Sequence, residues 1–322
     1  MRRTLPLVLL ALVLSPLMAS VARADIDEIE LRKAKSGKLD LGFSFIGLYE
    51  LGVGLNRDRG EVSSLLYLAP QLKIGSKMRA RVNFGVYGNS LGRQDNPWDL
   101  MDVQLQFSHL GFYKEKYTGV DFSGYVRYYF PTSKLSRNEG SFGQLRGTLK
   151  LSRTFWDKLF FSFEFNLQKY FHRYTTWSTE VSDVQYSAGL DEYIENNASF
   201  GFGETFTVTY SPIAGLDLSA IYGLIQTRQY GGGSATGISG SSLVDSRMTR
   251  SSYSTRLTLD ATIGLSALPW WKGKFIKDQI LDRLYVSIGY ANLSPQLVDG
   301  HHHFNPFDPR FAQAYFDLMV LY

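Results

Sequence analysis

Few residues of this chain have the type and spacing that catalytic or metal chemistry needs. The sequence contains five histidines and no cysteine, and His301, His302 and His303 are consecutive between Asp299 and Asp308. Imidazole binds Zn²⁺, Cu²⁺ or Ni²⁺, but adjacent histidines in a loop do not converge on one ion without a rigid frame and further contacts. We therefore predict a polar loop at this point, with no metal site and no cofactor.

Charged and amide side chains form the second chemically capable set, and they recur at every second position of several segments. Residues 255–266 alternate between apolar and polar side chains, as a strand with one apolar and one polar face does. If the apolar face meets lipid, the polar face lines an enclosed interior. The residues that we predict to line it are Arg81, Arg127, Arg146, Lys150, Glu164, Asn166, Arg256, Asp260 and Asp317.

One tight turn predicts a specific contact between these charges. A turn at Asp157 and Lys158 places Lys150 opposite either Glu164 or Asn166 across a hairpin, so we expect an ion pair between Lys150 and Glu164. Glu204 breaks the pattern because it shares the parity of the apolar positions around it. We expect it near the rim or at a bulge.

Long alternating segments predict about twelve strands. After residue 24 no apolar run is long enough for a spanning helix, and lipid accommodates only helices and closed barrels. Most of the segments reach the roughly 9–11 residues that a tilted strand needs to cross a bilayer. The predicted strands cover residues 39–55, 62–75, 79–91, 101–115, 118–131, 143–157, 159–175, 198–211, 215–229, 251–267, 281–293 and 311–322.

The connections between these segments fall into two classes. Short connections are expected at residues 75–77, 116–117, 157–158 and 212–214, and long polar ones at 92–100, 132–142, 176–197, 230–250 and 294–310. Short turns at one end and long loops at the other are typical of membrane barrels. Two connections depart from strict alternation, at 57–61 and 268–280.

The final segment, residues 311–322, alternates strictly and ends on the aromatic Tyr322. In this respect the chain resembles bacterial outer-membrane β-barrel proteins, a porin-like class whose last strand usually ends in Phe. The resemblance implies an all-β antiparallel transmembrane barrel, contact with outer-membrane lipids, and recognition of the C-terminal strand by the barrel insertion machinery. It names no solute.

The N-terminal residues carry the pattern of an export signal. Arg2 and Arg3 precede an apolar run over 5–18, and small residues follow at 21–24, so we expect a cleaved signal peptide over 1–24. A periplasmic lead-in over 25–38 and a single barrel domain over 39–322 complete the predicted organisation. Without the three arginines of the signal peptide, 31 of the 34 basic residues remain against 30 acidic ones, which gives no reason to expect a nucleic-acid partner.

Enzymes built on barrels are the first alternative. Outer-membrane phospholipases pair a histidine with a serine two residues away on one strand face, but the neighbours of His109 and His172 at that spacing are aromatic residues or glycine. An omptin-like site could use His172 with Glu180, Asp183 and Asp191. We find no constellation typical of a lipid A deacylase and predict no catalytic residue.

The sequence therefore favours an outer-membrane channel for passive diffusion of small polar solutes or ions. A barrel hydrolase and a plugged barrel whose external loops bind a ligand remain alternatives. The solute, the ion selectivity, the oligomeric state and the openness of the lumen are not determined by the sequence, because both signs of charge occur on the polar face and twelve strands lie between filled and open barrels.

Overall fold

The structure is a computed structural model that describes residues 41–55, 62–89, 98–174, 176–180, 192–230, 251–268, 281–295, 297–298, 301–302 and 305–322. The expected signal peptide over 1–24 and lead-in over 25–38 lie outside these residues. Among the residues described, no helix has the length and apolar character required to span a membrane.

All twelve predicted strands are present, with ends that differ from the predicted ones by a few residues. The barrel strands are β1 (Leu41–Gly54), β2 (Val62–Ile74), β3 (Met78–Asn89), β4 (Trp98–Leu100) with β5 (Gln104–Lys114), β6 (Asp121–Tyr129), β7 (Ser141–Phe155), β8 (Leu159–His172), β11 (Ala198–Ile213), β12 (Leu216–Gln229), β13 (Ser251–Gly264), β14 (Leu284–Pro295) and β17 (Ala312–Leu321).

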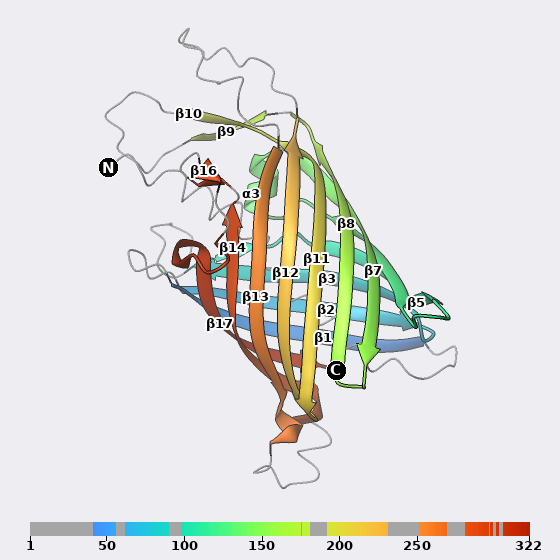
Figure 1. Cartoon of the computed structure of the whole chain (residues 1–322). Coiled ribbons are helices and arrows are strands. Elements are labelled where there is room, and N and C mark those ends of the chain that lie inside the picture. The colour runs from blue at the N-terminus through green and yellow to red at the C-terminus, as the bar shows by residue number, and fades with distance from the viewer. Residues whose placement is uncertain are drawn as a thin grey trace.

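Antiparallel pairing closes these strands into a ring (Figure 1). Each strand pairs with the next along the chain, and β17 pairs both with β14 and with β1, where Glu50 lies opposite Asp317. Because β4 and β5 both pair with β3, they form one interrupted strand and the ring has twelve strands. The predicted all-β antiparallel barrel is confirmed.

One predicted strand and one predicted loop differ from the structure. The strand predicted over 101–115 begins only at Gln104, and β4 lies in the loop predicted over 92–100. The gap between β4 and β5 contains Asp102, whose carboxylate accepts hydrogen bonds from Ser133 N, at 2.8 Å, and from the Ser136 hydroxyl. Ser133 is the N-cap of the short helix α3 (Lys134–Asn138), and Ser136 lies within it. The predicted loop over 176–197 contains a hairpin of β9 (Thr176–Glu180) and β10 (Glu192–Asn196).

Other connections contain short elements that the sequence pattern did not show. The predicted loop over 294–310 includes a two-residue pairing of β15 (Leu297–Val298) with β16 (His301–His302). Three single 3-10 turns occur at Leu265–Ala267, Leu281–Arg283 and Pro309–Phe311. None of them enlarges the ring.

Alternation along the strands separates an outer and an inner face. On β7, Leu145 and Leu149 are exposed, whereas Thr148, Lys150 and Ser152 at the opposite parity are buried. The same division holds on the neighbouring strands, where the exposed side chains are mostly Phe, Leu, Val and Tyr. A barrel with an apolar outside and polar inside is the arrangement that suits lipid.

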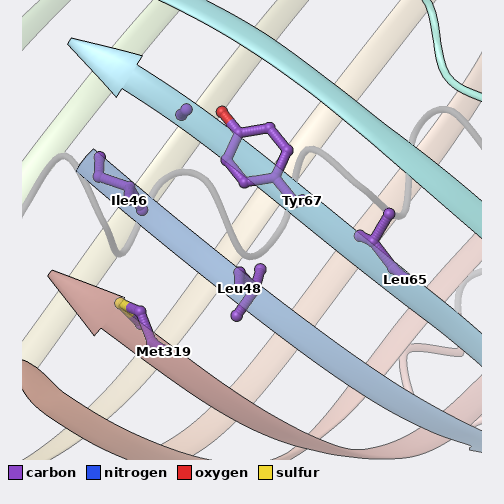
Figure 2. Packing of buried hydrophobic residues seen from close by; sticks show 6 residues of the cluster. Ile46, Leu48, Leu65, Tyr67 and Met319 are labelled. Carbon is purple, nitrogen blue, oxygen red and sulfur yellow. The ribbon is translucent and has the colours of Figure 1, made fainter.

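The inner face is not polar throughout. Ile46, Leu48, Leu65, Tyr67 and Met319 form a buried cluster on the inner side of β1, β2 and β17 (Figure 2). Ile46 and Leu48 share the parity of Glu50 and lie on the inward side of β1 although they are apolar. Tyr67 joins the cluster to the polar wall because its hydroxyl donates to Asn83 Oδ1 at 2.6 Å.

Gly289 on β14 is closely packed against Tyr315, and substituting it tests the packing of the inner wall. A Cβ atom added at Gly289 would overlap the ring of Tyr315 on β17 and lie 2.7 Å from the carbonyl oxygen of Leu259. We predict that Gly289→Ala destabilises the barrel by about 1–3 kcal/mol, because overpacking forces the ring and strand apart. The measurement is the urea midpoint of the refolded protein in lipid vesicles.

Gly147→Ala is the matched control, since an added Cβ at Gly147 on β7 meets nothing within 4 Å. Equal urea midpoints for the two variants would contradict the packing of Tyr315 against Gly289.

Candidate functional site

All nine residues predicted to line the interior lie on the inner face of the barrel. Arg81 is on β3, Arg127 on β6, Arg146 and Lys150 on β7, Glu164 and Asn166 on β8, Arg256 and Asp260 on β13, and Asp317 on β17. They divide into two groups on separate arcs of the ring, one mostly basic on β3 to β8 and the other mostly acidic on β13 and β17, to which Glu50 on β1 adds a further acid.

The predicted ion pair is present in the basic group. Lys150 pairs in register with Glu164, and Lys150 Nζ lies 3.0 Å from Glu164 Oε1. Their side chains are 6% and 10% exposed, so neither charge has much access to water. The Lys150 ammonium also lies 5.8 Å from the ring centroid of Phe160. Next to this pair, the Thr148 hydroxyl donates to Asn166 Oδ1.

Two arginines of the basic group lie side by side. Arg127 on β6 is the register partner of Arg146 on β7. Arg127 Nε donates to Gln106 Oε1 at 2.8 Å, and Arg146 Nε donates to Gln168 Oε1 at 3.0 Å. Both guanidinium groups lie within 6 Å of the Tyr129 ring centroid, at 5.9 and 5.4 Å. These glutamine and tyrosine partners are uncharged.

Two carboxylates lie side by side in the acidic group. Glu50 on β1 is the register partner of Asp317 on β17, and both side chains are buried. The alternation along β1 already indicates in the sequence that Glu50 faces inward, and the structure buries it there. Arg256 and Asp260 on β13 are also buried, and Arg256 Nε donates to Thr258 Oγ1 at 3.5 Å.

The two like-charge pairs lie on different walls of the barrel. In the strand order, β7 and β17 are six strands apart in whichever direction the ring is followed. Arg146 and Asp317 therefore belong to opposite walls. Opposed walls of unlike charge produce an electric field across the lumen, which is strong where water is scarce.

The two histidines considered for catalysis, His109 and His172, pack against aromatic rings. The ring of His109 packs edge-on against Phe112, with centroids 5.9 Å apart, and His172 stacks on Tyr170 with centroids at 6.3 Å. Asp183 and Asp191 lie outside the described residues, as do the side chains of Glu180, His301 and His302. Within the described part of the chain, no group of three His, Cys, Asp or Glu residues could hold a metal ion.

Comparison with known proteins identifies the fold and no family. No protein-family model and no curated protein matches the sequence. An outer membrane channel from Pseudomonas putida F1 is similar in structure, with a TM-score of 0.52 and 9% identity over 89% of this chain and 98% of that one. The chain has the fold of an outer-membrane β-barrel channel.

Two porin structures match with lower scores. The NanC porin has a TM-score of 0.43 and 12% identity, and the KdgM porin in complex with disordered oligogalacturonate has 0.42 and 9% identity. Each match covers 87% of this chain and 98% of the porin.

The Lys150–Glu164 pair yields a prediction on stability. Lys150→Met leaves the Glu164 carboxylate buried without its cation, and we expect a loss of about 3–5 kcal/mol in unfolding free energy. The double variant Lys150→Met with Glu164→Leu should recover most of this loss, because apolar residues of similar volume tolerate burial. Urea unfolding in lipid vesicles measures both. A double variant as unstable as the single one would show that the ion pair is not the source of the loss.

Proposed function

We propose that this protein is an outer-membrane channel for passive diffusion of small polar solutes or ions, which pass between a basic and an acidic wall. The single observation that carries this proposal is the pair of like-charge contacts, Arg127 with Arg146 and Glu50 with Asp317, on separate arcs of the inner face. The apolar outer face supports the location in the membrane.

Like charges at directly opposed strand positions destabilise a sheet. The charge of Arg256 offsets part of this repulsion at Glu50. Local features that oppose stability are expected where function requires them. Guanidinium groups attract anionic or hydrogen-bond-accepting parts of a solute, and carboxylates attract cationic or donating parts.

The tight packing of the inner wall limits the size of the solute. Arg81 and Arg127 are each 2% exposed, and Asn83 on the same strand as Arg81 and Gln106 on the intervening β5 are also buried. A wide column of water along this wall would leave these side chains exposed. The passage that we propose is therefore narrow, and suits ions and small polar molecules.

The same burial favours a second candidate, a barrel that is plugged and binds a ligand outside. In this alternative the buried charges form a structural network, and the external connections bind the ligand. Conductance distinguishes the two candidates, because a plugged barrel does not pass ions.

We predict stepwise conductance when the purified protein is added to a planar lipid bilayer. Arg146→Glu should lower the ratio of anion to cation permeability several-fold, because it reverses one charge of the arginine pair. Reversal potentials in a salt gradient measure the ratio. Lys169→Glu reverses a charge on the outer face of β8 and should leave the ratio unchanged.

Heat-modifiable migration in gels confirms that each variant is folded before its conductance is interpreted. Folded wild-type protein that is silent in the bilayer would overturn the channel in favour of the plugged barrel. Conductance with unchanged selectivity in Arg146→Glu would remove the arginine pair from the passage.

A further inference from the structure

Two carboxylates meet on the inner wall at the seam where the first and last strands of the ring pair. Glu50 on β1 is the register partner of Asp317 on β17, and the two residues are only 7% and 5% exposed. Directly opposed positions of an antiparallel pair bring the Cβ atoms to about 4.5–5.5 Å, so both carboxylates lie within reach of one common ion. Without such an ion the two charges repel each other, and strongly so where water is scarce.

The carboxylate of Asp317 has no donor within the described part of the chain. Its Oδ1 atom is buried and receives no hydrogen bond, and no residue that the structure describes forms an ion pair with it. A buried charge without a partner is unfavourable. Such a group in a folded protein requires an explanation, and a bound ion is one that accounts for a carboxylate.

The positions around the carboxylate pair are mostly apolar. On one side the next inward residues of β1 and β17 are Leu48 and Met319, which belong to the apolar cluster shown in Figure 2. Leu65 of the same cluster lies opposite the pair on β2. On β14 the opposite residue is Ser287, whose hydroxyl already shares a hydrogen bond with the Thr262 hydroxyl. These neighbours leave the pair without a cation on either flanking strand.

The charges that act on the pair from β13 have opposite signs. Arg256 attracts Glu50 and offsets part of the repulsion there. Asp260 on the same strand repels Asp317, as Glu50 does. The group therefore contains three carboxylates and one guanidinium, and the charges that act on Asp317 are both negative. An enclosed wall with an excess of negative charge attracts a cation.

We propose that Glu50 and Asp317 bind a hard divalent cation, Ca²⁺ or Mg²⁺, at the closing seam of the barrel. Carboxylate oxygens are the ligands that these ions prefer. The chain contains no cysteine, and no histidine is among the neighbours of the pair, so an ion that prefers sulfur or imidazole has no ligand here. Within the described residues no third acid or histidine completes a closed metal site. The ion therefore keeps part of its water shell, as Mg²⁺ commonly does when two carboxylates bind it.

An ion at this place joins the first and last strands of the ring. It replaces the repulsion between the two carboxylates by attraction of both to one cation, and so stabilises the barrel at the pairing of β1 with β17. The proposal does not depend on conduction. A barrel that is silent in the bilayer experiment would leave it unaffected, and a barrel that binds no divalent ion would leave the channel unaffected.

Binding is tested with the purified protein in vesicles of phosphatidylcholine, whose headgroups carry no net charge. Equilibrium dialysis measures the number of Ca²⁺ ions bound per chain, and competition by Mg²⁺ shows which of the two ions the site prefers. Urea unfolding is followed in EDTA and in increasing CaCl₂ or MgCl₂, at constant pH and at an ionic strength kept constant with NaCl. We expect one ion per chain and a urea midpoint that rises with the logarithm of the ion concentration, because the ion binds the folded state.

Two neutral variants of similar shape locate the site. Asp317→Asn and Glu50→Gln should each weaken binding at least tenfold and abolish the rise of the midpoint. In EDTA both should be at least as stable as the wild type, because one charge of the repelling pair is gone. Asp157→Asn is the matched control, since it removes an exposed carboxylate in a turn where φ is 56°, a conformation that Asn adopts readily. It should bind the ion as the wild type does.

Three results would overturn the proposal. The first is a folded wild-type protein that binds neither ion at millimolar concentration, which would mean that the carboxylates share a proton instead. The second is binding that Asp317→Asn and Glu50→Gln leave unchanged, which would place the ion elsewhere. The third is an equal loss in Asp157→Asn, which would indicate unspecific attraction to negative charge. Heat-modifiable migration establishes that each variant is folded, and the wild-type measurement decides even where a variant does not fold.

Discussion

Closure of the β-sheet is the constraint on which the rest of this structure depends. Lipid offers no hydrogen-bond partners, so every backbone N–H and C=O group of a spanning strand needs a partner on a neighbouring strand. The pairing of β17 with β1 removes the two free edges that the sheet would otherwise have. Once the sheet is closed, successive side chains of each strand point either to the lipid outside or to the enclosed interior.

Enclosure within the barrel removes the inner side chains from water. In an open sheet, Lys150 and Glu164 would form an exposed pair of little energetic weight. Inside the barrel the pair is almost fully buried, and the neighbouring arginines are held by glutamines and tyrosine rings. The apolar cluster on β1, β2 and β17 covers a further part of the wall. The interior therefore combines a packed apolar region with two charged regions, and any passage is narrow.

Most of the fold could be predicted from the sequence, and part of the site. The twelve strands and the inward parity of nine polar residues follow from a period of two, and the ion pair follows from one tight turn. The break at Asp102 was not predicted, because its cause is a contact with serines about thirty positions away. The apolar inner cluster was not predicted, because Ile46 and Leu48 are apolar residues on the same face of β1 as Glu50. The bulge expected at Glu204 is absent, because the register of β11 with both of its neighbours is continuous there.

The sequence by itself determined which side chains face lipid and which face inward, because successive residues of a strand point to opposite sides wherever the strand lies. It also determined the order of the hairpins, since short connections join neighbouring strands. Only the tertiary structure decided which inward residues confront one another. Arg146 and Asp317 occupy opposite walls because the ring closes with six strands between β7 and β17 on either side. That relation depends on the number of strands in the closed ring and on their register, which no local stretch of sequence contains.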